Sequence, residues 1–126
     1  MKNNPKPEIK HSFIIRESEW LHREGGLKSQ FLRAEDKKKC CIGIFLISCG
    51  ILEEQLVGVK TPEIFIKNGG VLPQQAKWLI EKDGTSGLAK YLMTRNDMEF
   101  GLTEEKQKEA IKKGFAQGGV EAIFVP

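Results

Sequence analysis

The longest apolar run in the chain occupies residues 40–49 and contains no charged side chain. Ten residues are too few to cross a bilayer as a helix, which needs about 20, so the run predicts an element buried inside the protein. Both faces of the run are apolar, and periodicity alone therefore does not separate a buried helix from a buried strand. Gly50 stands where a left-handed C-terminal cap would end a helix. This favours a helix, preceded by a short extended segment at residues 39–41.

Short apolar segments near both ends of the chain predict strands. Residues 12–16 (SFIIR) form one, and residues 120–125 (VEAIFV) form another in which Val120, Ala122 and Phe124 face the same side. We expect these two strands to pair and so to join the two ends of the chain. Residues 30–33 predict a further short strand, which would enter a small hairpin through the polar turn at residues 35–37.

Capping and helix-breaking residues predict several helices between the strands. Pro62 stands at a first helical position after Thr61. Thr103 is an N-cap followed by two acidic residues, which the helix dipole favours there, and Ile111 and Phe115 form the inward stripe of that helix. The predicted helices cover residues 19–23, 51–57, 63–67, 74–82, 87–95 and 104–117.

Together these elements predict a helix-rich α+β fold with a small sheet of N- and C-terminal strands. The chain has 126 residues, the size of one ordinary domain. We expect a single globular domain over residues 12–126, preceded by a flexible arm at residues 1–11 that two prolines keep irregular. The arm has no apolar segment of the secretory kind, and the cysteine count is odd. Both features indicate a reducing cytoplasm.

The net charge of the chain excludes few classes of function. The chain has 20 basic and 17 acidic residues, for a formal net charge of +3. That excess is too small to indicate nucleic-acid binding by itself. Neither phosphate-binding glycine pattern, GxGxxG or GxxxxGK[ST], occurs in the sequence.

The adjacent thiols of Cys40 and Cys41 are the first candidate for chemistry. A metal site needs four converging ligands in a spacing such as C-x-x-C, and the only histidines are His11 and His22. A nucleophilic thiol needs a nearby base and a lowered pKa, and no histidine is close in sequence. We therefore expect buried structural thiols, and we predict no catalytic residue, no metal ligand and no cofactor.

Two polar segments are candidates for binding. Arg33 with Lys37, Lys38 and Lys39 forms a basic turn that could contact phosphate, although a solvated turn is the plainer interpretation. Arg95, Asn96 and Asp97 follow an amphipathic helix and carry both signs of charge. They could hold a ligand or contact a partner, or they could simply end the helix, since Asn and Asp hydrogen-bond local backbone there.

Aromatic residues offer a third kind of site. Trp20, Trp78, Tyr91 and Phe100 could line a binding groove. Core packing is the plainer explanation for each of them.

The sequence also resembles a known family. The segments SEWLHREGG, LRAEDKKKCCIGIFLISCGI, LMTRNDMEFGLTEEKQ and GGVEAIFV are similar to a family of small phage and prophage proteins of unknown function. That family has a Cys-Cys-Leu-Gly signature after a polar turn and a later Asn-Asp pair. Here Cys40-Cys41-Ile42-Gly43 and Asn96-Asp97 match, with Ile42 in place of leucine. The family's turn has Asp-Gly where this chain has Asp36-Lys37, so a tight two-residue turn does not carry over.

The resemblance implies a viral or mobile-element origin and the cytoplasm of a bacterial host, and it implies no activity. Our first hypothesis is a non-enzymatic phage accessory protein that binds and inhibits or modulates a host factor, either a defence protein or its small nucleotide signal. The second is nucleic-acid binding through Arg33, Lys37–Lys39 and the basic arm, and the third is a cysteine-dependent enzyme. No association with a membrane is expected.

Overall fold

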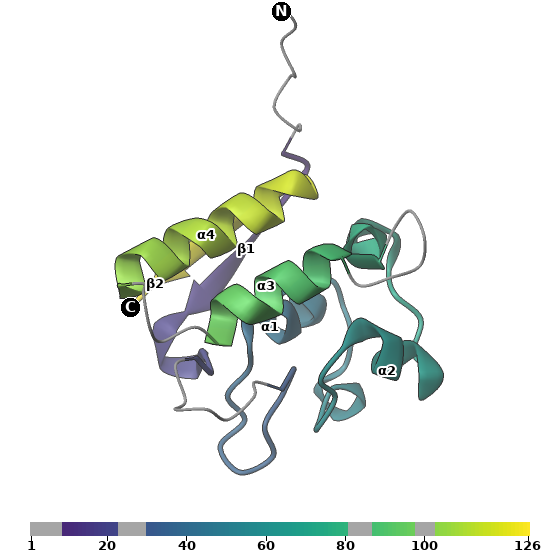
Figure 1. The fold of residues 1–126 in the computed structure, drawn as a ribbon. Coiled ribbons are helices and arrows are strands. Elements are labelled where there is room, and N and C mark those ends of the chain that lie inside the picture. Colours follow the sequence, from purple (N-terminus) through teal and green to yellow (C-terminus); the bar gives the residue numbers. More distant parts are fainter. Residues whose placement is uncertain (1–8, 23–29, 81–86, 98–102) are drawn as a thin grey trace, which may run out of the picture.

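The protein is a small, single α+β domain that is rich in helix (Figure 1). The computed structural model describes residues 9–22, 30–80, 87–97 and 103–126. Residues 1–8 of the predicted arm lie outside this part of the chain. No helix in the described ranges is long and apolar enough to cross a membrane.

The two ends of the chain meet in a sheet, as predicted. Strand β1 (His11–Arg16) pairs with strand β2 (Val120–Val125), and the pairing is parallel with Ile14 opposite Ile123. Phe13, Ile15, Val120 and Ala122 are buried on the inner face of the sheet. Helix α4 (Glu104–Gln117) lies against this pair of strands in Figure 1. The side chain of Thr103 caps α4 by accepting a hydrogen bond from the Lys106 N–H.

The apolar run forms a buried helix, which confirms the preferred prediction. Helix α1 (Cys41–Ser48) follows an extended residue at Cys40. Gly50 has φ +103, its N–H bonds to the Ile47 carbonyl, and the Ile51 N–H bonds to the Leu46 carbonyl. These two bonds form a Schellman motif, which needs a left-handed residue at the position of Gly50. Five of its eight residues are buried, and its apolar composition fits a helix that packs inside the domain.

Helix α3 is the helix that packs most closely on α1 among the elements described. Helix α2 (Pro62–Lys67) begins with a proline and is capped by the Thr61 hydroxyl, which accepts a hydrogen bond from the Ile64 N–H. A seven-residue 3-10 helix, η3 (Gln74–Ile80), comes next, and helix α3 (Gly87–Asp97) then packs between α1 and α4. Figure 1 shows α3 and α4 side by side, with α2 at the far side of the domain from the sheet.

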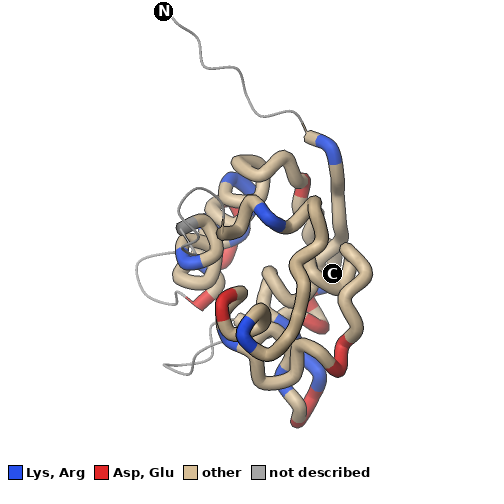
Figure 2. The backbone as a smooth tube through the Cα atoms, turned by 90° about the vertical axis from the view of Figure 1, so that its right-hand side faces the viewer, with Lys and Arg blue, Asp and Glu red and all other residues tan. Residues whose placement is uncertain are grey.

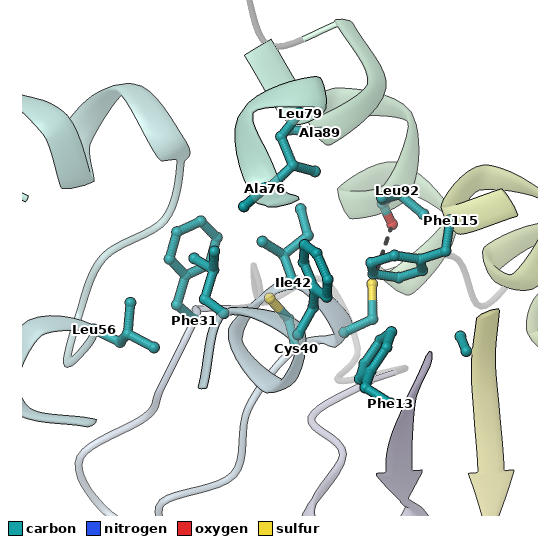
Figure 3. Packing of buried hydrophobic residues seen from close by; sticks show 14 of the residues in the cluster. Phe13, Phe31, Cys40, Ile42, Leu56, Ala76, Leu79, Ala89, Leu92 and Phe115 are labelled. Atoms are coloured by element: carbon teal, nitrogen blue, oxygen red, sulfur yellow. Dashed lines mark hydrogen bonds between the residues drawn. The ribbon is translucent and has the colours of Figure 1, made fainter. Parts of the chain in front are cut away.

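The core is one continuous cluster of apolar side chains, part of which is drawn in Figure 3. Phe45 of α1 is fully buried and contacts the rings of Phe13 and Phe115 at centroid distances of 5.3 Å each. Helix α1 also approaches the backbone of Phe31 closely. A Cβ atom at Gly43 would lie 1.9 Å from the Phe31 carbonyl oxygen, so only glycine fits at that position.

Some local predictions were wrong. Residues 20–22 of the predicted helix 19–23 are not helical, and residue 23 lies outside the described part. A 3-10 turn, η1 (Glu17–Glu19), comes earlier, and Trp20 is extended and forms a parallel bridge with Lys39. Residues 30–33 form no strand: Leu32 makes only an isolated bridge to Val57. The helix expected at residues 51–57 is a short 3-10 turn, η2 (Glu53–Gln55).

Candidate functional site

The Asn96 side chain connects three distant segments of the chain. Its Oδ1 accepts hydrogen bonds from the indole Nε1 of Trp20 at 2.7 Å and from the backbone N–H of Cys41 at 3.0 Å. Its Nδ2 donates to the Leu21 carbonyl at 2.8 Å. The side chain has no solvent exposure. Asn96 therefore ties the end of α3 to the start of α1 and to the segment after β1.

A second buried amide supports the same corner. The Gln107 Nε2 of α4 donates to the carbonyls of Arg95 at 2.9 Å and Asn96 at 2.8 Å. These carbonyl oxygens lie at the C-terminal end of α3, where the helix itself has no backbone N–H groups left to bond them. A ligand outside the protein would not reach the Asn96 amide in this arrangement. Of the three predicted residues here, Arg95 and Asp97 are half-buried, and the Arg95 guanidinium lies 4.7 Å from the Tyr91 ring centre.

The basic turn uses two of its four cationic side chains internally. The Arg33 guanidinium donates from Nε and Nη2 to the Asp36 carboxylate at 3.1 and 2.6 Å. Lys39 is only 8% exposed, and its Nζ donates to the Lys37 carbonyl at 3.0 Å. Lys37 is exposed and Lys38 is half-buried.

The backbone of the turn is closed by hydrogen bonds from the Arg33 N–H to the Lys38 carbonyl and from the Lys37 N–H to the Arg33 carbonyl. Lys37 has φ 62, a left-handed conformation that glycine adopts more readily. The pKa of Asp36 is lowered to about 2, chiefly because its carboxylate accepts the Arg33 hydrogen bonds and also one from the Lys38 N–H.

The turn is connected to the end of α3 through the Trp20–Leu21 segment. Lys39 pairs with the Trp20–Leu21 segment, and that segment holds Asn96. In the described ranges, no contact joins the Lys37 or Lys38 side chain to α3. Figure 2 shows acidic and basic positions interspersed along the backbone. This distribution gives the nucleic-acid hypothesis little support.

The vicinal thiols are inside the core. Cys40 and Cys41 are 1% and 0% exposed, and burial raises the pKa of Cys40 to about 12 and that of Cys41 well above its usual value. The Cys41 Sγ lies 4.0 Å from the Leu92 carbonyl oxygen, the dashed contact in Figure 3. A thiol in such surroundings is a poor nucleophile. Within the described residues, no three His, Cys, Asp or Glu side chains converge as metal ligands would.

The histidines are placed away from these thiols. His11 lies against Phe45 and within 3.4 Å of the Ser48 hydroxyl, and His22 stacks on the Trp20 ring at a centroid distance of 3.5 Å. Neither arrangement is a thiol–imidazole pair of the kind that activates a nucleophilic cysteine.

The outer face of the sheet is a surface that sequence analysis did not single out. Side chains alternate along a strand, so the residues between the buried ones point outward. Ile14 is 48% exposed and Ile123 is 37% exposed, and the two stand opposite one another in the register. Arg16 and Glu121, also exposed, flank this apolar pair. The strand pattern predicted the alternation, but it did not indicate which face the rest of the chain would cover.

Sequence analysis also missed a pocket. A hollow of about 400 Å³ lies between the start of β1, the first turns of η3 and the junction of α4 with β2. Of the four aromatic residues proposed for a groove, Trp78 lines this pocket. Trp20 is in the core, Tyr91 is half-buried on α3, and Phe100 is outside the described residues. The pocket combines segments from three distant parts of the sequence, and no local pattern marks it.

Comparison with known proteins leaves the chain unassigned. No family model matches it, and neither a curated protein nor a solved structure is significantly similar to it.

Proposed function

We propose that this protein is a non-enzymatic binding protein, a phage accessory protein that inhibits or modulates a factor of its bacterial host in the host cytoplasm. The phage origin rests on the resemblance carried by Cys40-Cys41-Ile42-Gly43 and Asn96-Asp97. The proposal that it acts by binding rests on the structure. The thiols that a cysteine-dependent mechanism would use are buried and have raised pKa values, so their placement supports a structural role.

The observation that carries the proposal is the exposed Ile14–Ile123 pair. Parallel sheets are normally covered on both faces, because their strands are apolar on both sides. Here the inner face is buried and the outer face presents two large apolar side chains in direct register. Such a pair favours association with an apolar surface on another protein. The flanking Arg16 and Glu121 provide charges of both signs for the rim of that contact.

The basic turn and the end of α3 belong to the polar surface that surrounds the domain. Lys37 is exposed, and Lys38 and Arg95 are half-buried at the surface. We place these three side chains at the periphery of the contact with the same host factor. Rim charges of this kind chiefly change the rate of association and its salt dependence.

The test uses a matched pair of exposed isoleucines. Ile14 is 48% exposed on β1, and Ile66 is 42% exposed on α2. Tagged wild type, Ile14→Ser and Ile66→Ser are incubated with lysate of the bacterial host, and retained proteins are identified and then titrated as purified species. We expect one host protein to bind wild type and Ile66→Ser equally, and to bind Ile14→Ser at least tenfold more weakly. Circular dichroism and thermal unfolding confirm that both variants fold.

Two results would overturn the proposal. One is that no host protein binds, or that Ile14→Ser binds it as wild type does. The other is that sedimentation shows a dimer of the chain that Ile14→Ser dissociates, because the exposed pair would then be covered by a second copy.

A further inference from the structure

The pocket at the start of β1 has the chemistry of a small-ligand site. Its volume of about 400 Å³ lies in the lower part of the range of about 300–1,000 Å³ that is usual for such sites. Lys10 and His11 form one side, and Gln74, Gln75 and Trp78 of η3 form another. Gly118 and Gly119, at the end of α4, complete it.

The two glycines keep the pocket open. A Cβ atom at Gly118 would lie 2.1 Å from the Cδ2 of Trp78, so any side chain there would displace the indole ring. Gly119 has φ +79, which glycine tolerates and other residues adopt at a cost. The indole is also held by a hydrogen bond from its Nε1 to the Gln75 carbonyl at 2.8 Å and by a ring contact with Phe115. The apolar wall of the pocket is therefore preorganised.

The polar groups of the pocket have spare hydrogen-bonding capacity. Within the described ranges, the side-chain amides of Gln74 and Gln75 make no hydrogen bond, and each can both donate and accept. The Lys10 ammonium has no ion-pair partner in the same part of the chain, while the Lys10 N–H bonds to the Gly119 carbonyl and fixes its backbone. None of the described lining residues carries a carboxylate. The formal charge at this pocket therefore favours an anion.

The end of α4 disfavours an anion in the pocket, because the C-terminus of a helix carries a partial negative charge. Its last carbonyls are partly neutralised here: the Gly118 N–H bonds to the Phe115 carbonyl and the Gly119 N–H to the Ala116 carbonyl. The full positive charge of Lys10 is larger than the partial negative charge that remains at the end of α4.

We infer that this pocket binds a small planar anion of the nucleoside monophosphate class. The aromatic base would lie against Trp78, its polar edge would bond the Gln74 and Gln75 amides, and the phosphate would face Lys10. The first hypothesis from the sequence named a small nucleotide signal of the host as one possible target. The pocket gives that target a binding site, and in this respect the inference rests on the proposed function. The binding surface is distinct from the Ile14–Ile123 pair, since no residue that lines the pocket belongs to that pair.

The experiment titrates the whole chain with AMP, GMP, CMP and UMP separately, by calorimetry and tryptophan fluorescence. Because Trp20 is 2% exposed and Trp78 lines the pocket, a ligand-dependent change in fluorescence reports mainly on Trp78. We expect saturable binding of at least one nucleotide. Lys10→Glu should weaken it at least tenfold, and Gln74→Ala should weaken it about threefold or more. Lys60→Glu, which reverses an exposed lysine outside the pocket, should leave it unchanged.

Three results would overturn the inference. They are the absence of saturable binding for all four nucleotides, inorganic phosphate binding as tightly as the best nucleotide, and weakening by Lys37→Glu but not by Lys10→Glu. The Ile14→Ser variant separates this site from the proposed function. It should bind nucleotide like wild type while losing the host protein, and a failure of one assay leaves the result of the other standing.

Discussion

The indole Nε1 of Trp20 donates a 2.7 Å hydrogen bond to the Oδ1 of Asn96, although the two residues are 76 positions apart in the chain. Both side chains are buried. The same Oδ1 also accepts the Cys41 N–H, the first amide of the apolar helix. This polar junction therefore fixes where α1 starts relative to α3 and to the segment that follows β1.

Replacing Asn96 with alanine should destabilise the protein strongly. The substitution removes the acceptor of the Trp20 indole N–H and of the Cys41 N–H, and the side-chain donor to the Leu21 carbonyl, in a buried place. Each unsatisfied group costs about 1–3 kcal/mol, so the free energy of unfolding should fall by about 3 kcal/mol or more. Urea denaturation monitored by circular dichroism measures this change.

The control is Asn68→Ala, at the exposed C-terminal end of α2. It should change the free energy of unfolding by no more than about 0.5 kcal/mol, as exposed substitutions commonly do. Equal stability of the two variants would show that Asn96 is not a structural junction. The residue would then be available for the binding role that the sequence suggested.

Gly43→Ala tests the close approach of α1 to Phe31. Alanine is a better helix former than glycine by about 1 kcal/mol, and an exposed helix would gain from the change. Here the new Cβ would meet the Phe31 carbonyl oxygen at 1.9 Å, so backbone must move. We expect thermal unfolding to reveal a net loss of about 1–3 kcal/mol.

Lys112→Ala, on the exposed side of α4, is the comparison for Gly43→Ala and should be nearly neutral. An unchanged or raised melting temperature for Gly43→Ala would mean that α1 does not pack on the Phe31 backbone.

Much of the fold was predictable because its signals are local. Thr103 and Thr61-Pro62 mark helix starts by their own chemistry, Gly50 marks the end of α1, and the alternation of residues 120–125 indicates a half-buried strand. The structure confirms each of these. The parallel pairing of β1 with β2 is a long-range property, and the sequence predicted the pairing without its direction.

The predictions that failed depend on partners far away in the chain. Trp20 looked like a helix residue, yet it is extended because its backbone pairs with Lys39 and its indole bonds Asn96. Asn96 is typical of a helix end that bonds local backbone, and nothing in its neighbourhood indicated a buried junction between three segments. The pocket beside Trp78 was beyond local analysis for the same reason.

The Arg33–Asp36 pair gives the basic turn a measurable pH dependence. The pKa of Asp36 is about 2 in the folded protein, against 3.8 ordinarily. A lowered pKa means that the pair stabilises the turn above pH 3.8 and loses this effect as the pH falls from 3.8 to 2. A carboxyl-carbon NMR titration should therefore place the Asp36 midpoint near pH 2.

Arg33→Ala should raise the pKa of Asp36 toward its ordinary value, because the guanidinium hydrogen bond is the largest cause of the shift. Lys38→Ala should change it little, since the bond from the backbone N–H of residue 38 is retained. A midpoint near pH 4 in the wild-type protein would show that Arg33 does not hold Asp36.

The most direct test of the whole account is the reactivity of the cysteines in the folded protein. If α1 is packing and the protein acts through its surface, a thiol-specific reagent at pH 8 should leave Cys40 and Cys41 unmodified in the native state, as measured by mass spectrometry of digested protein. Cys49, which is half-buried and has a raised pKa, should react slowly, and all three should react in urea. Rapid, stoichiometric modification of Cys40 or Cys41 without denaturant would contradict the account and would favour the third hypothesis, a cysteine-dependent enzyme.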